Sequence, residues 1–132
     1  METTINYKPV HIEMTDDSPQ ITLDADKFVF KIEGASYPEN SYDVYNVVID
    51  WIRKLDGDVK SKLNCDFNFS VLSSASHKMI YEIITLLDGL HKKSNNVTVN
   101  WHYQTSDEDL FEIGEDFSDI VDVPFKFYSL EG

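Results

Sequence analysis

Three stretches of the chain alternate apolar and polar residues, which is the period of a β-strand with one buried face. They run from Phe28 to Ile32, from Leu63 to Val71 and from Val97 to Tyr103. A shorter apolar group at Ile21 to Leu23 lies just before the first of them and is expected to pair with it as a hairpin. The alternation predicts a sheet with one face in the core and one polar face.

Three other stretches repeat apolar residues at the 3.6-residue period of an amphipathic helix. They are Val44 to Leu55, Met79 to Leu90 and Leu110 to Ile120. Pro38 and Asn40 precede the first stretch and favour a helix start there. The chain therefore alternates strands with helices, as α/β proteins do.

Residues with known capping preferences mark the ends of these helices. Asp56-Gly57-Asp58 is expected to end the first helix, with Gly57 in the left-handed conformation, and Asn95-Asn96 to end the second. Thr105 or Ser106 is expected to cap the start of the third helix.

The segment from Leu63 to Tyr103 reads as strand, helix and strand, a unit that almost always forms a right-handed parallel crossover. Strands covered on both faces are continuously apolar, so alternating strands place the helices mainly on one face.

With weaker strands at Val10 to Met14 and Phe125 to Tyr128, we predict one α/β domain over residues 1–132. It is a mixed sheet of four to five strands with about three helices, preceded by a loose N-terminal arm at residues 1–19. The polar face, exposed or covered by a partner, carries Asn64, Asp66, Asn68, Asn100 and His102.

The composition limits the kinds of partner and site. The 132 residues have a formal net charge of -13, which repels nucleic acid and anionic membrane surfaces, so we expect basic or neutral protein surfaces as partners. The N-terminal residues lack the features of a secretory signal, and no apolar run reaches the roughly 18 to 20 residues of a membrane span. A cytoplasmic location without direct membrane contact is therefore expected. The single Cys65 excludes an intrachain disulfide and a cysteine-based metal site.

A serine-rich turn, Val71 to Lys78, joins the central strand to the long helix. If Ser73 is the N-cap, its hydroxyl accepts a backbone N–H, and Ser74 becomes the first helical residue with its side chain facing water. A phosphate on Ser74 would lie beside the free N–H groups and the positive end of the helix dipole. The alternative is that the serines only cap the helix.

Other patterns give no catalytic, metal or cofactor site. Ser76 and His77 are adjacent in a helix and point about 100° apart, so they cannot act as nucleophile and base. The four histidines lack metal-ligand spacing, and the acidic run Asp107 to Asp122 lacks the pattern of a calcium loop. A small enzyme is the disfavoured alternative. A binding protein is the favoured class.

Five segments resemble, in order and spacing, a family of SiaC-type bacterial regulatory phosphoproteins, which is related in fold to STAS-domain anti-sigma-factor antagonists. The match extends over about residues 28–128. The segments are Ser36 to Tyr42, Val48 to Trp51, Leu72 to Lys78, Trp101 to Tyr103 and Gly114 to Phe117.

The resemblance implies a STAS-like fold and a non-catalytic switch protein. Members are phosphorylated on a hydroxyl at the N-terminus of the helix after the central strand, by a dedicated protein kinase, and dephosphorylated by a PP2C-type phosphatase. The position corresponds to Ser74, with Ser73 and Ser76 as alternatives. In the best-known system the unphosphorylated form activates a diguanylate cyclase and so links the switch to cyclic-di-GMP and biofilm formation. An anti-sigma-factor-antagonist role in transcription is the alternative output.

Loops at the carboxyl ends of parallel strands usually carry the function of such sheets, so two segments there are favoured over the polar sheet face, the alternative, for binding the partner. The resemblance implies that these two segments lie close together. One is the loop of Tyr37, Pro38, Glu39 and Asn40. The other is the serine turn, with Ser73, Ser74, Ser76, His77 and Lys78.

Overall fold

The structure, a computed structural model, describes residues 8–55 and 58–131. These residues form one six-stranded sheet whose spatial order follows the sequence, β1-β2-β3-β4-β5-β6. The first two pairs of neighbours are antiparallel and the last three are parallel. The mixed sheet is confirmed, with one or two strands more than expected. The strands are β1 (Val10–Ile12), β2 (Gln20–Asp24), β3 (Val29–Ser36), β4 (Leu63–Leu72), β5 (Val97–Gln104) and β6 (Phe125–Leu130).

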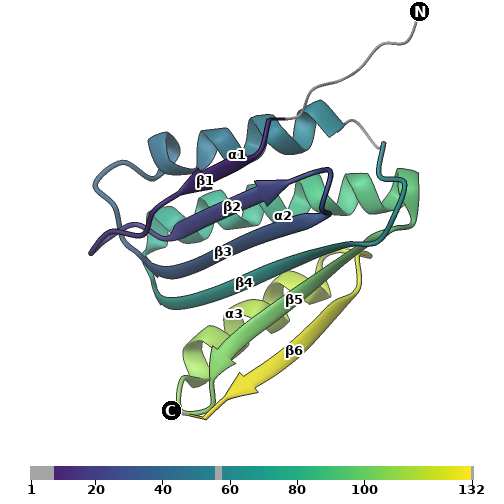
Figure 1. Cartoon of the computed structure of the whole chain (residues 1–132). Coiled ribbons are helices and arrows are strands. Elements are labelled where there is room, and N and C mark those ends of the chain that lie inside the picture. Colours follow the sequence, from purple (N-terminus) through teal and green to yellow (C-terminus); the bar gives the residue numbers. More distant parts are fainter. Residues whose placement is uncertain (1–7, 56–57, 132) are drawn as a thin grey trace, which may run out of the picture.

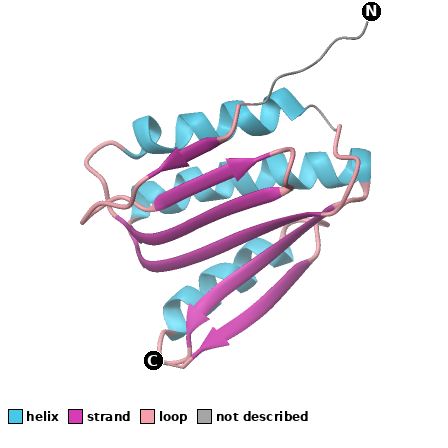
Figure 2. Ribbon diagram, viewed as in Figure 1, coloured by secondary structure: helices cyan, strands magenta, loops and turns pink. Residues whose placement is uncertain are grey.

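Three helices connect the parallel strands: α1 (Ser41–Leu55), α2 (Ser74–Ser94) and α3 (Glu108–Asp119). Each crosses between neighbouring strands in the same direction, and crossovers of one hand place successive helices on one face of a sheet. All three helices lie on the same side of the sheet (Figures 1 and 2). The one-sided covering is therefore confirmed. No helix in the described residues is long and apolar enough to cross a membrane.

A row of aromatic rings occupies the space between the sheet and the helices. Phe67 of β4 lies at the centre, 5.5 Å from Phe30 of β3 and 5.8 Å from Trp101 of β5 between ring centroids. Trp101 in turn contacts Phe117 of α3 edge-on at 5.8 Å. All four rings are almost completely buried. Burial of each such side chain contributes about 1.5 to 3 kcal/mol, so this row is a main source of the stability of the layer.

A β-bulge interrupts the pairing of β3 with β4 near their carboxyl ends. Gly34 pairs with Phe69, and Ala35 pairs with Val71, so Ser70 has no partner on β3. The extra residue reverses the alternation of β4. Val71, which the pattern predicted to be buried, is therefore 47% exposed, and Leu72 packs against the core instead.

The N-terminal strand and the helix starts agree with the sequence in part. The short strand expected in Val10 to Met14 is present as β1, so residues 10–12 belong to the sheet, whereas residues 1–7 of the predicted arm lie outside the described residues. Asn40 caps α1, because its Oδ1 accepts the N–H of Asp43 at 3.3 Å. The cap of α3 is neither Thr105 nor Ser106 but Asp107, whose Oδ1 accepts the N–H of Leu110 at 3.1 Å.

The helix ends likewise differ in part. Asn95 ends α2 in the left-handed conformation, with φ of 61°, as its cap role predicts. The cap expected at Gly57 lies outside the described residues. Ile120 was expected on the buried face of α3 but is 58% exposed. It follows the last residue of the helix, so it no longer shares the helical period.

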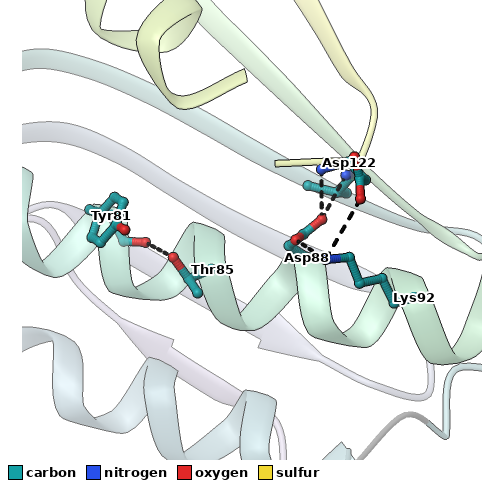
Figure 3. Close-up of polar contacts among 6 residues, drawn as sticks. Tyr81, Thr85, Asp88, Lys92 and Asp122 are labelled. Carbon is teal, nitrogen blue, oxygen red and sulfur yellow. Dashed lines mark hydrogen bonds and ion pairs between the residues drawn. The ribbon is translucent and has the colours of Figure 1, made fainter. Parts of the chain in front are cut away.

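Asp88 of α2 fastens the segment before β6 to the helix layer (Figure 3). Its Oδ1 accepts the backbone N–H groups of Asp122 at 2.9 Å and Val123 at 2.8 Å. Its Oδ2 lies 3.2 Å from the ammonium of Lys92, which also lies 3.6 Å from Asp122. Burial by itself raises the pKa of Asp88, but the two N–H donors and Lys92 outweigh it and hold the pKa below its ordinary value.

Gly114 of α3 allows that helix to lie directly on Trp101. A Cβ at position 114 would be 2.5 Å from the indole Cδ1, which is far inside van der Waals contact. The indole N–H also donates to the carbonyl of Leu110 at 2.9 Å, so the ring cannot turn away without losing that bond. We predict that Gly114→Ala lowers the free energy of unfolding by about 1 to 3 kcal/mol through overpacking.

Gly89 of α2 provides the matched control, because a Cβ there meets no atom within 4 Å. Gly89→Ala should leave stability unchanged or raise it by up to about 1 kcal/mol through helix propensity. Urea denaturation of the three proteins measures both values. Equal effects of the two substitutions would contradict the close helix–indole contact.

The Asp88 bonds predict a pH-dependent contribution to stability. A carboxyl whose pKa is lowered on folding stabilises the fold above its unfolded pKa of about 3.9 and loses that effect as pH falls through its folded pKa. Asp88→Asn should therefore cost about 1 to 3 kcal/mol at neutral pH, and the difference from wild type should narrow below about pH 4. Thermal unfolding from neutral to acidic pH tests this. The control is Asp122→Asn, since that carboxylate is 81% exposed and should matter little.

Candidate protein-interaction site

The two segments expected to bind a partner lie side by side at the carboxyl edge of the parallel strands. The loop Tyr37 to Asn40 follows β3, and the serine turn follows β4, its neighbour in the sheet. The N–H of Ser73 donates to the carbonyl of Ser36 at 2.9 Å and so ties the two segments together. The loop is also tied to the β1–β2 connection, because the N–H of Tyr37 donates to the carbonyl of Asp17 at 2.8 Å.

Ser73 is the N-cap of α2, as the sequence predicts. Its backbone is extended, with φ of −70° and ψ of 164°, and its Oγ accepts the N–H of Ser76 at 3.2 Å. Its carbonyl accepts the first helical bond, from His77 at 2.8 Å. The Ser73 hydroxyl therefore satisfies one of the N–H groups that every helix start leaves free.

The three serines of the turn differ in access to solvent. Ser74 is exposed, and no hydrogen bond of its side chain is found among the described residues. Ser73 is half-buried and engaged in the cap, whereas Ser76 is completely buried. Ser76 was expected to contact a partner, but its burial gives it an internal role in this conformation.

The start of α2 also differs from the other helix starts in charge. The first turn of α1 carries Asp43, and the first turn of α3 carries Glu108 and Asp109, but the first turn of α2 carries no acidic residue. The positive end of the α2 dipole is therefore not compensated by a carboxylate of its own first turn.

Beneath this surface four buried hydroxyl groups form a cluster, which we call the hydroxyl cluster: Ser36, Ser41, Tyr45 and Ser76. The Ser36 hydroxyl donates to Ser76 Oγ at 2.8 Å and lies 2.5 Å from the Tyr45 hydroxyl. Ser41 Oγ lies 3.3 Å from Ser76 Oγ. Burial raises the pKa of Tyr45 far above its ordinary value, more than its bonds to Ser36 and Ser76 lower it. Because Ser36 donates its only hydroxyl proton to Ser76, the Tyr45 hydroxyl donates to Ser36.

Sequence reasoning missed this cluster. Only one local signal was available: Ser41 and Tyr45 are four residues apart and so share a face of α1. Their partners come from the end of β3 and the start of α2, at sequence separations of 35 and 40 for the two bonds of Ser76. A local sequence pattern does not indicate contacts between residues so far apart in the chain.

Exposed apolar and charged side chains occur on the segments that flank the loop and the serine turn. Tyr37, Tyr42, Val71 and Tyr81 are 48%, 61%, 47% and 48% exposed, and Lys78 is exposed as well. Of the other expected binding residues, Glu39 and Asn40 are exposed, Pro38 is half-buried, and His77 is half-buried against the ring of Phe117 at 5.0 Å. Of these exposed apolar residues, Tyr37 was expected at the binding surface, and Tyr42, Val71 and Tyr81 were not. The two tyrosines on the helices lie off the apolar stripes, and Val71 is turned outward by the bulge.

The uncovered polar face of the sheet is held by its own side chains. Asp66 Oδ1 accepts the Asn100 amide at 2.9 Å and lies 3.3 Å from His102 Nε2, while the His102 ring stacks on Tyr128 at 5.0 Å. Asn100 is only 8% exposed, so it is not part of an open surface. Among the described residues no group of three or more His, Cys, Asp and Glu side chains could hold a metal ion.

Comparisons of the sequence and of the structure with known proteins point to the same family. Residues 12–130 match the sequence model of the SiaC family regulatory phosphoprotein. An uncharacterized protein of Pseudomonas aeruginosa strain UCBPP-PA14 is 33% identical over 116 residues, which cover 88% of this chain and 92% of that protein.

Two solved structures of that organism share the fold. SiaC of Pseudomonas aeruginosa is 30% identical, with a TM-score of 0.83 over 93% of this chain and 99% of that chain. A chain in the crystal structure of the diguanylate cyclase SiaD in complex with its activator SiaC is 31% identical, with a TM-score of 0.84 over 92% of this chain and 99% of that chain.

The division of roles in the turn predicts unequal effects of two alanine substitutions. Ser73→Ala removes the cap acceptor and should lower the free energy of unfolding by about 1 kcal/mol. Ser74→Ala removes an exposed hydroxyl and should change it by less than about 0.5 kcal/mol. Chemical denaturation of both variants measures the difference. A larger loss for Ser74→Ala would mean that the cap is assigned to the wrong serine.

Proposed function

Since the chain belongs to the SiaC family of regulatory phosphoproteins, we propose that it is a non-catalytic protein whose partner binding is switched by phosphorylation of Ser74. The observation that carries this proposal is the exposure of Ser74 at the N-terminus of α2, beside two serines whose hydroxyls are engaged. A kinase can reach this hydroxyl without unfolding the helix.

The local charges favour a phosphate at this position. The free N–H groups of the first turn and the positive end of the helix dipole attract an anion, and no carboxylate of that turn competes with it. A phosphate would bring a charge of about −1.5 to −2 to the docking surface, by which we mean the start of α2 and the neighbouring loop Tyr37 to Asn40. Desolvating that charge against an apolar partner surface would be costly, so phosphorylation should release the partner.

We propose a diguanylate cyclase as the partner. The SiaC protein of similar structure is the activator of the diguanylate cyclase SiaD. In this proposal the unphosphorylated chain binds and activates a cyclase, a cognate protein kinase adds the phosphate, and a PP2C-type phosphatase removes it. The switch then acts in the cytoplasm and controls cyclic-di-GMP production and biofilm formation.

The test compares Ser74→Ala and Ser74→Asp as affinity baits in the source organism. We expect the alanine variant to retain a diguanylate cyclase and the aspartate variant to lose it, because only the latter adds charge to the docking surface. Mass spectrometry of the protein from its own host should find phosphate on Ser74 that a PP2C-type phosphatase removes. Equal capture of the same proteins by both variants would rule out the switch at Ser74.

Ser106→Asp is the charge-matched control. Ser106 is exposed and lies at the same edge of the sheet, before α3. The same added charge at this position should leave cyclase capture unchanged. Loss of capture by the control would indicate a general effect of net charge and not a site.

A further inference from the structure

The loop Tyr37 to Asn40 is bracketed by two members of the hydroxyl cluster. Ser36 immediately precedes the loop, and Ser41 immediately follows it. Both hydroxyls bond to the hydroxyl of Ser76, at 2.8 and 3.3 Å. Both ends of this four-residue loop are therefore attached to one residue in the first turn of α2.

Ser76 also takes part in the cap of α2. Its backbone N–H donates to Ser73 Oγ at 3.2 Å, while its side chain lies completely buried in the cluster. A shift of this residue changes the cap and the cluster together. The backbone of Ser76 thus belongs to the helix start beside Ser74, and its side chain holds both ends of the loop.

The cap bond is one that a phosphate can disturb. At 3.2 Å it is at the long end of the range for an N–H···O bond, and its acceptor is a neutral hydroxyl. Charged phosphate oxygens are stronger acceptors and form shorter bonds. A phosphate on Ser74 would accept the N–H of Ala75, would compete with the Ser73 hydroxyl for the N–H of Ser76, and would draw the backbone of Ser76 toward it.

We propose that the hydroxyl cluster couples the phosphorylation of Ser74 to the Tyr37–Asn40 loop, so that Ser36, Ser41, Tyr45 and Ser76 are positioning residues of the docking surface. This inference rests on the proposed function of Ser74 as the phosphorylated residue. The cluster is buried, where a hydroxyl that loses its partner gains no bond to water in return. Displacement of Ser76 therefore moves Ser36 and Ser41 with it, and the loop between them follows.

The test follows the loop in the free protein by NMR, with Ser74→Glu as the source of charge. The N–H of Tyr37, which donates to Asp17, gives a measurable exchange rate. Ser74→Glu should shift the amide signals of Glu39 and Asn40 and speed exchange at Tyr37 by about threefold to tenfold, as for the weakening of one hydrogen bond. The amides of Ala75 and Ser76 should shift as well.

The same substitution is then made in two backgrounds that remove the side-chain bonds of Ser76, Ser76→Ala and the double variant Ser36→Ala with Ser41→Ala. Each removes both bonds between Ser76 and the ends of the loop, and each is checked for folding by thermal unfolding. In both backgrounds Ser74→Glu should still shift the amides of residues 75 and 76, but its effect on Tyr37 exchange should disappear. A cluster that only stabilises the fold would leave the effect of Ser74→Glu on the loop unchanged.

Tyr103→Phe is the matched control. Tyr103 is half-buried on β5, its ring packs on Phe111 at 4.9 Å, and no hydrogen bond of its hydroxyl is found in the described part of the chain. The effect of Ser74→Glu on the loop should persist in this background. Loop signals that ignore Ser74→Glu in the wild type, or that respond equally in all backgrounds, would overturn the coupling.

Cyclase capture by the Ser74 variants is measured separately, so the two proposals fail in distinguishable ways. If capture does not depend on residue 74 while the loop responds through the cluster, the proposed switch is wrong and the coupling stands. If capture depends on residue 74 while the loop does not respond, the phosphate acts by local charge alone and the coupling is wrong.

Discussion

The handedness of the crossovers determines where this molecule can present a binding surface. Three parallel connections of one hand, made between sequential neighbours, place all helices on one face and all helix N-termini at one edge of the sheet. Loops from distant parts of the chain, such as Tyr37 to Asn40 and the serine turn, therefore meet at that edge. The proposed docking surface consists mainly of loops and a helix start. The strand order brings these segments together.

Within this edge, electrostatics distinguishes one helix from its neighbours. The chain has a formal net charge of -13, and the first turns of α1 and α3 carry their own carboxylates. The first turn of α2 carries none. An anion added there meets the least local repulsion, and the small side chains of Ser74 and Ala75 leave its backbone N–H groups accessible. An acidic protein can in this way retain a position at which added negative charge has a local effect.

The sequence predicted those features that depend on near neighbours. The alternation of β4 from Leu63 to Phe69, that of β5, the helical stripe of α2 and the cap at Ser73 are local, and the structure confirms them. It could not predict the bulge at Ser70, because an unpaired residue is defined only by its partner strand. The two bonds of Ser76 in the hydroxyl cluster and the backbone bonds of Asp88 join residues more than 30 positions apart. Their polar members resemble surface residues in any local pattern. Asp107, and not Thr105 or Ser106, caps α3 because a turn follows β5, in which the N–H of Asp107 donates to the carbonyl of Gln104. The helix therefore begins after this turn.

The bulge at Ser70 has a consequence for how the serine turn evolves. Because β4 has one extra residue there, Leu72 points inward and packs against the core just before the serine turn begins. Without it, the inward and outward positions at the end of the strand would exchange. Which serine is accessible thus depends on the extra residue in β4 as well as on the sequence of the serine turn. Relatives that lack the bulge would need a compensating residue in the turn to keep a hydroxyl at the same place.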